Sequence, residues 1–210
     1  MIKRLVIDVD NTIILWKEEY TIALKKVMKE YNLNVDYKII DNIIEVQEKV
    51  YNRMDKNHLL NDINKECNLN LNIDFIDKLL EYQKEIAPEK DEKFIGLFKY
   101  LSSKYELVML TNYYVEPQIG RLKKLGIDIY FKEFYGGDIV PLKPSSEAFY
   151  KAIGSHKPEE CIMIGDSIPY DIEGALNIGM NVILVDLLDK IKEEKEYKII
   201  NNLYELKNIL

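Results

Sequence analysis

The chain has 210 residues, of which 47% are hydrophobic and 31% charged, enough for one core or for a core with a smaller insert. A net charge of −7 and a pI near 5.1 argue against nucleic-acid binding, which usually needs a basic face. No apolar run is long enough to span a bilayer, and the acids at positions 8 and 10 interrupt the opening apolar stretch, so it does not read as a signal peptide. Only two cysteines occur, far apart, and we expect a cytoplasmic protein without disulfides or a cysteine metal site.

The sequence pattern in the first half of the chain predicts one strand followed by helices. Residues 3–9 form a short, largely apolar run with several β-branched residues, which is typical of a buried strand. Apolar residues then recur at spacings of three and four, which predicts helical faces. The expected helices are 16–31, Val35–Met54 with Asp36 as its cap, His58–Cys67, and Ile73–Ala87, which Pro88 ends. We interpret 16–87 as a four-helix bundle inserted after the first strand.

Strands and helices alternate in the rest of the chain. The expected strands are Leu107–Leu110, Phe134–Gly136, Cys161–Ile164, Asn181–Val185 and Lys198–Ile200. The helices between them are Lys93–Ser103, Glu116–Leu125 closed by Gly126, Ser145–Ile153, Tyr170–Ile178 and a short final one. This alternation predicts an α/β fold: a Rossmann-like parallel sheet with helices on both faces, built from 1–15 and 88–210.

Two carboxylates, Asp8 and Asp10, end the first predicted strand. Side chains two residues apart on a strand point the same way, so both acids face one spot. At 4 Å and an effective dielectric of 20 they would repel by ~4 kcal/mol. The pair therefore needs a cation, a shared proton, or both. The structural alternative is a turn, because Asp and Asn side chains often bond back to the local backbone.

Further polar residues follow other predicted strands. Thr111 and Asn112 end the second strand, and Asp166 ends the fourth, with Asp171 five residues later. Lys143 precedes Pro144, which we expect to open a helix. Each feature alone can be a turn, a helix entry or a cap. Together they are hard to explain as turns, since ligands of parallel sheets bind beyond the carboxyl ends of the strands.

The set of motifs resembles the haloacid dehalogenase superfamily of phosphohydrolases. The four motifs of that superfamily correspond to Asp8-Val9-Asp10-Asn11-Thr12, Leu110-Thr111-Asn112, Lys143-Pro144, and the segment from Gly165 to Asp171. The resemblance covers about residues 1–16 and 88–186. By the same resemblance, the helical insert 16–87 is similar to the all-helical (C1-type) cap of the superfamily.

The resemblance implies a role for each motif residue. Asp8 would be the nucleophile that forms an aspartyl-phosphate. Asp10 would be the general acid and then the base, and neighbouring carboxylates would favour the proton that it needs first. Lys143, the Thr111 hydroxyl and the Asn112 backbone N–H would stabilise the transferring group. Mg²⁺ would bind Asp8, Asp166 and the backbone carbonyl of Asp10, and Asp171 would orient metal-bound water or Lys143.

A charge count supports a metal independently of the resemblance. The four acids Asp8, Asp10, Asp166 and Asp171 sum to −4, and Lys143 brings the total to −3. A divalent cation would reduce it to −1 and a proton on Asp10 to zero, so that a phosphate could enter.

We therefore expect a Mg²⁺-dependent phosphatase acting on a small phosphorylated metabolite, such as a nucleoside monophosphate, a sugar phosphate or phosphoglycolate. The acid at position 10 favours phosphomonoester hydrolysis, because dehalogenases of the superfamily lack it. A phosphomutase and a catalytically silent phosphate-binding regulator stay as alternatives, and the oligomeric state cannot be read from the sequence.

One departure and one open question concern the substrate. Tyr113 and Tyr114 follow the Thr-Asn pair where many relatives have glycine, and they either line the substrate entrance or pack beneath the cap. Residues of the insert that could contact a leaving group, or else lie in its core or on its surface, are Trp16, Lys17, Tyr20, Arg53, Lys56 and His58.

Overall fold

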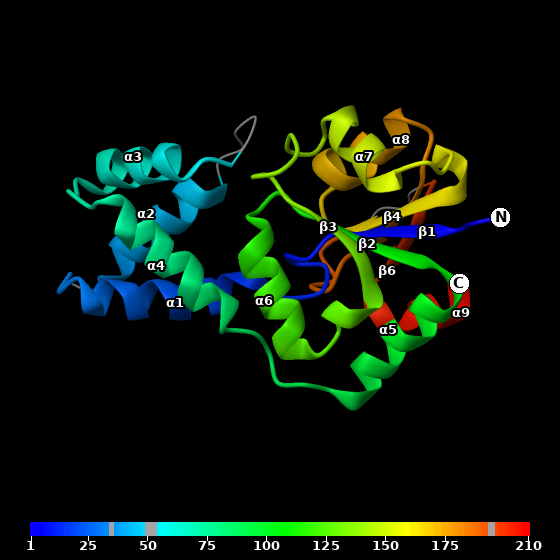
Figure 1. Cartoon of the computed structure of the whole chain (residues 1–210), viewed down its shortest axis with the longest axis horizontal. Coiled ribbons are helices and arrows are strands. Elements are labelled where there is room, and N and C mark those ends of the chain that lie inside the picture. Colours follow the sequence, from blue (N-terminus) through cyan, green and yellow to red (C-terminus); the bar gives the residue numbers. More distant parts are fainter. Residues whose placement is uncertain (34–35, 49–53, 193–195) are drawn as a thin grey trace.

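A parallel sheet forms the centre of the larger part of the molecule (Figure 1). The computed structural model describes residues 1–33, 36–48, 54–192 and 196–210. These residues form a six-stranded sheet of order β3-β2-β1-β4-β5-β6, in which all neighbours are parallel. The strands are β1 (Arg4–Ile7), β2 (Glu106–Leu110), β3 (Phe131–Tyr135), β4 (Cys161–Gly165), β5 (Asn181–Val185) and β6 (Lys198–Ile200). The predicted α/β fold with a parallel sheet is confirmed.

Helices cover both faces of this sheet because its side chains alternate between two apolar clusters. Leu5 and Ile7 pack with the helices of one face, α5 (Glu92–Lys104), α6 (Val115–Leu125) and α9 (Leu206–Ile209). Val6 packs with those of the other face, α7 (Ser146–Ile153) and α8 (Glu173–Asn177). Each such side chain contributes roughly 1.5–3 kcal/mol by leaving water. The result is a three-layer core.

The helical insert comprises α1 (Trp16–Glu30), α2 (Tyr37–Glu48), α3 (Lys56–Cys67) and α4 (Ile73–Lys84). Its helices share an apolar cluster of their own, whose fully buried members include Leu24, Ile63 and Phe75. Local capping fixes two of the helix starts: Asp36 accepts the backbone N–H of Lys38 at 3.0 Å, and Asp55 that of His58 at 2.9 Å. Figure 1 shows the insert beyond the sheet, on the side away from both chain termini.

The predicted element boundaries were wrong in several places. Helix α4 ends at Lys84 rather than at Ala87, because the N–H of Glu85 and Ile86 turn back to carbonyls three residues earlier. Pro144 does not open a helix: α7 begins at Ser146. Strand β3 begins three residues before the predicted start at Phe134.

The predicted helix Tyr170–Ile178 is a π-helical turn over Ile168–Ile172 followed by α8. Of the predicted helix Val35–Met54, α2 covers Tyr37–Glu48 and Met54 is not helical, whereas Val35 and residues 49–53 lie outside the described residues.

Helix α6 is the point at which the insert meets the sheet domain. A Cβ on Gly120 would lie 2.8 Å from the backbone oxygen of Lys84, so α6 and the end of α4 approach closely. Tyr114 and Leu142 also join the apolar cluster of the insert, and the Met54 N–H donates to the Gly137 carbonyl at 2.8 Å. In the described part of the chain, no helix has the length and apolarity needed to cross a membrane.

Candidate active site

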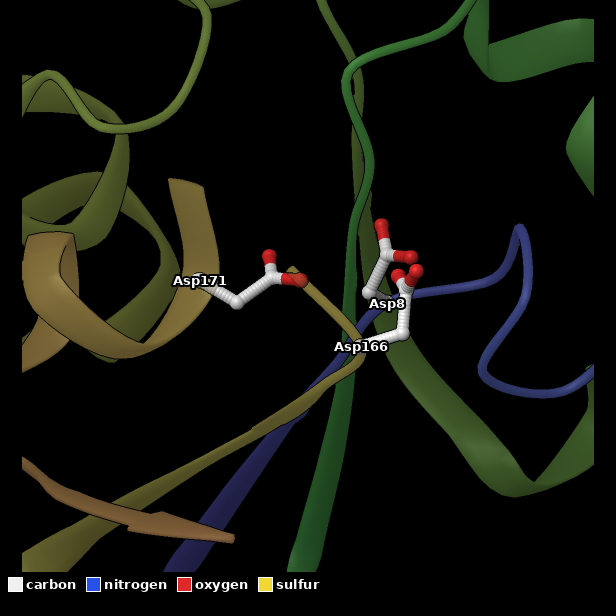
Figure 2. Close-up of side chains that lie close together, drawn as sticks. All are labelled: Asp8, Asp166 and Asp171. Atoms are coloured by element: carbon white, nitrogen blue, oxygen red, sulfur yellow. The ribbon is translucent and has the colours of Figure 1, made fainter. Parts of the chain in front are cut away.

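Three buried or half-buried carboxylates meet beyond the carboxyl ends of β1 and β4. The backbone N–H of Asp8 donates to the carbonyl of Ile164 at 2.9 Å, so the parallel register brings Asp8 beside Asp166. Carboxylate oxygens of Asp8, Asp166 and Asp171 all lie within 4.8 Å of one another. Figure 2 shows the three side chains converging from two strand ends and the following turn. Residues separated by more than 150 positions therefore share one site, as the strand-end pattern predicted.

Asp171 is held at this site by the turn after β4. Its backbone N–H donates to the Ser167 carbonyl at 2.8 Å, and its carboxylate accepts the Ser167 N–H at 3.0 Å. Gly165 leaves the necessary room, because a Cβ there would lie 2.3 Å from a carboxylate oxygen of Asp171. The glycine at the end of β4 is thus required by the close approach of this acid.

Lys143 inserts its ammonium group between two of these acids. Its Nζ lies 2.7 Å from Asp8 and 2.5 Å from Asp171, and only 3% of its side chain is exposed. The Asn112 side chain positions the lysine backbone, since it accepts the Lys143 N–H at 2.7 Å and donates to the Lys143 carbonyl at 3.0 Å. Asn112 thus holds the backbone of Lys143 ahead of α7, which begins at Ser146.

The surroundings of the acid cluster strongly shift the pKa values of its members. Burial raises the pKa of the Asp8 carboxyl well above its usual value, against the opposing charge of Lys143, and the neighbouring acids raise it further. Burial, with the charge of Asp171, likewise raises the pKa of Asp166 to about 7. Burial lowers the pKa of Lys143, but Asp171 and Asp8 outweigh it, and the net direction is upward. One lysine does not compensate three carboxylates, and a hard divalent cation fits this oxygen cluster.

Asp10 lies beside the cluster and is held by helix α6. The chain turns after Asp10 through Asn11, whose φ of 57° lies in the left-handed region that asparagine tolerates. Gln118 Nε2 donates to Asp10 Oδ2 at 2.5 Å, and Arg121 Nη1 donates to Asp10 Oδ1 at 2.5 Å. The sequence predicted Asp10 at this site but neither of these two partners.

Thr111 and Asn112 also reach the site. The Thr111 hydroxyl accepts a long bond of 3.4 Å from Gln118 Nε2, and the side chain of Thr111 is buried. The Asn112 side chain is occupied by the Lys143 backbone. The use of the Asn112 backbone N–H toward a substrate stays a prediction.

A cavity of about 350 Å³ opens above these residues, between the insert and the sheet domain. The insert contributes Trp16, Glu19, Tyr20, Met54 and Gln83, whereas the remaining lining residues come from the strand-end loops and α6. Of the insert residues considered from the sequence, Trp16 and Tyr20 line the cavity, Lys17, Lys56 and His58 are exposed, and Arg53 lies outside the described residues.

Both alternatives for the tyrosine pair apply, one to each residue. Tyr113 lines the cavity, and its hydroxyl donates to Gln83 of the insert at 2.7 Å. Tyr114 is buried in the apolar cluster of the insert and packs edge-on against the Tyr113 ring. Tyr113 therefore lines the cavity, and both tyrosines contact the insert.

Two further charged residues line the cavity beside the five whose charges sum to −3. Arg121 adds one positive charge and Glu19 one negative charge, so their contributions cancel and the total of −3 is unchanged. Burial raises the pKa of Glu19, and the guanidinium of Arg121 acts in the opposite direction. The net negative charge on which the expectation of a cation rests is therefore unchanged.

The helical periodicity of α6 indicates that Gln118 and Arg121, the two partners of Asp10 that were not predicted, are buried. The buried apolar residues Val115, Leu122 and Leu125 mark the inner face of α6. Gln118 and Arg121 fall on that same face, where a polar residue needs a partner. The sequence shows that partners are required but not which residues supply them.

Comparison with known proteins agrees with the motifs. A family model described as haloacid dehalogenase-like hydrolase matches residues 2–179. Glyceraldehyde 3-phosphate phosphatase of Methanothermobacter thermautotrophicus is 33% identical over 119 residues, 52% of this chain and 53% of that protein. Pyrimidine 5'-nucleotidase PynA of Streptococcus pneumoniae is 32% identical over 83 residues, 38% of this chain and 35% of that protein. The chain thus aligns with about half, or less, of the length of these curated relatives.

Solved structures agree in fold over the whole chain. The HAD-hydrolase YfnB from Bacillus subtilis has a TM-score of 0.79 at 22% identity, covering 99% of this chain and 98% of that chain. A HAD phosphatase from Thermococcus onnurineus has a TM-score of 0.68 at 22% identity, with coverage of 99% and 97%. The insert and the sheet domain therefore occur together in the same overall fold in these proteins.

Proposed function

The chain belongs to the haloacid dehalogenase-like hydrolase family, and on that basis we propose that it hydrolyses small phosphate monoesters with Asp8 as the nucleophile. The observation that carries the proposal is the buried Asp8 carboxylate, 2.7 Å from Lys143 and beside Asp166, at the floor of a cavity. The phosphatase names of the curated relatives support the same reaction class.

In the proposed reaction an oxygen of Asp8 attacks phosphorus, and the new P–O bond forms as the bond to the leaving oxygen breaks. Asp10 gives its proton to the leaving oxygen. Water then attacks the aspartyl-phosphate, Asp10 takes a proton from it, and Asp8 is released with inorganic phosphate. Lys143, the Thr111 hydroxyl and the Asn112 N–H stabilise the charge of the transferring group in both steps.

The donor set fits Mg²⁺ as the resident ion. Asp8, Asp166 and the backbone carbonyl of Asp10 would hold it, and Asp171 would orient these ligands together with Lys143. When bound, the ion offsets the carboxylate charge and polarises the phosphoryl oxygens. The support for this assignment is the buried oxygen cluster itself, which one lysine leaves undercompensated.

The substrates proposed are small metabolites such as a nucleoside monophosphate, a sugar phosphate or phosphoglycolate. A cavity of about 350 Å³ with aromatic and polar walls suits leaving groups of this size. Isomerisation of a hexose phosphate without phosphate release would instead support a phosphomutase.

The test is a phosphate-release assay on a panel of such metabolites and an aryl phosphate with Mg²⁺, using Asp8→Asn. Loss of the nucleophile should lower kcat by at least about 1,000-fold. The matched control is Asp41→Asn, which removes an exposed carboxylate from α2. Equal activity of the two variants would contradict the proposal, as would a wild-type protein that releases no phosphate from any member of the panel.

A further inference from the structure

We propose that Gln118 and Arg121 are positioning residues that hold the Asp10 carboxylate for its proton transfers, an inference that rests on the proposed function. Each oxygen of this carboxylate has its own donor: Gln118 Nε2 at 2.5 Å from Oδ2 and Arg121 Nη1 at 2.5 Å from Oδ1. Two donors on two oxygens fix the plane of a carboxylate, whereas one donor leaves it free to rotate.

The two donors are also fixed relative to each other. Arg121 Nη1 donates to Gln118 Oε1 at 2.8 Å, which closes a triangle with Asp10. This contact settles which end of the Gln118 amide faces the acid. Gln118 is fully buried one helical turn from Arg121, and its Nε2 also reaches the Thr111 hydroxyl at 3.4 Å. Helix α6 thus holds both donors in fixed positions, and these donors orient the side chain of Asp10, which stands on a turn.

Fold stability does not explain the burial of Arg121. Only 6% of its side chain is exposed, and Asp10 is its ion-pair partner. Its Nε and Nη2 are buried without hydrogen-bond partners among the described residues. A buried charge with two unpaired donors is costly, and a hydrophobic residue of similar size would often be neutral or stabilising. The residue is therefore better explained by what it does for Asp10 at the cavity.

The chemistry predicts which steps lose rate without this support. A poor leaving group such as phenolate needs a proton from Asp10 during phosphorylation of Asp8, whereas 2,4-dinitrophenolate leaves without one. Hydrolysis of the aspartyl-phosphate needs Asp10 as a base whichever group has left. A positioning role therefore makes the defect in kcat/KM depend on the leaving group, and a general loss of structure does not.

The experiment compares phenyl phosphate and 2,4-dinitrophenyl phosphate with Arg121→Met and Gln118→Met in the full chain with Mg²⁺. For Arg121→Met, kcat/KM for phenyl phosphate should fall roughly 100-fold and that for 2,4-dinitrophenyl phosphate less than about twofold. On the second ester kcat and KM should fall together, because hydrolysis of the aspartyl-phosphate becomes rate-limiting. Gln118→Met should show the same pattern more weakly, and Arg121→Lys should recover part of the loss.

The control is Lys123→Met, which removes a positive charge from the exposed side of the same helix and should match the wild type. Equal losses of kcat/KM on both esters, or no loss relative to this control, would overturn the inference. If Arg121→Met does not fold, the isosteric Gln118→Met decides between these outcomes. A wild-type protein inactive on both esters would count against the proposed function itself, whereas an active one with insensitive variants would count against the positioning role alone.

Discussion

Arg4 shows how a buried arginine is accommodated when it stabilises the fold. It lies at the opposite end of the sheet from the acid cluster, with 7% of its side chain exposed. Its Nε and Nη2 donate to Glu106 at 3.1 and 2.7 Å, Nη2 also to Glu133 at 3.0 Å, and Nη1 to the Ala152 carbonyl at 2.9 Å. Every nitrogen has a partner, in contrast to Arg121.

Glu106 links this network to solution pH. Hydrogen bonds from Lys132, Arg4 and His156 lower the pKa of Glu106 to about 2, from a usual value near 4.5. An acid whose pKa is lower in the folded state stabilises the fold above its unfolded pKa, and this contribution is lost as the pH falls from about 4.5 to 2. We predict that Glu106→Gln lowers the free energy of unfolding by about 1–2 kcal/mol at pH 7.

Urea denaturation at pH 7 and at pH 3 measures this effect. The difference between Glu106→Gln and wild type should shrink on acidification, because the wild type then loses part of what the variant has already lost. Glu159→Gln, an exposed change nearby, is the control. A difference that stays constant between the two pH values would contradict the assignment.

At the scale of single elements, helix α6 combines two contacts that constrain its sequence. Its inner face carries the donors to Asp10, and Gly120 faces the end of α4. Alanine normally improves a helix interior by up to about 1 kcal/mol relative to glycine. A Cβ at Gly120 would meet the Lys84 backbone at 2.8 Å, however, and the two helices would have to separate.

We therefore predict that Gly120→Ala destabilises the protein by about 1–3 kcal/mol and also lowers kcat, because the donors to Asp10 lie on the displaced helix. Gly96→Ala is a matched control on α5, where a Cβ would meet no atom within 4 Å and should be neutral or stabilising. Chemical denaturation and the aryl phosphate assay measure both effects. Equal stability of the two alanine variants would refute the close contact.

The sequence predicts those parts of the site that depend on strand order. Asp8 and Asp166 directly follow β1 and β4, and parallel strands bring their ends together whatever the details of packing. Lys143 stands in a loop and was predicted from its motif alone. The partners of Asp10 could not be predicted, because they depend on how α6 is rotated and how far it stands from β1. The end of α4 was misplaced for a related reason: backbone turns after Lys84 close the helix before Pro88 is reached, and no periodicity marks them.

At the scale of the whole molecule, the cavity lies where the insert meets the sheet domain, and Lys143 compensates only part of the charge of its acid cluster. An ion that binds only the folded protein raises its stability by about 2.7 kcal/mol at 100 times its dissociation constant. For a chain of this size each kcal/mol raises the unfolding temperature by roughly 2–4 °C.

We predict that saturating Mg²⁺ raises the unfolding temperature by about 5–10 °C, and that Asp166→Asn removes most of this increase. Differential scanning calorimetry with and without EDTA measures the shift independently of catalysis. Glu173→Gln, an exposed acid on α8, controls for general charge effects. A shift of the same size in Asp166→Asn would show that the ion binds elsewhere.

The acid cluster and the cavity wall opposite it come from different parts of the chain, which affects how this protein can change over evolutionary time. Asp8, Lys143, Asp166 and Asp171 all stand on the sheet domain, whereas Trp16, Glu19, Tyr20 and Gln83 reach in from the insert. Mutations in the insert that reshape the cavity wall leave the acid cluster of the sheet domain unchanged. New specificities can therefore accumulate in the inserted helices by gradual drift, provided that the surface against α6 is preserved.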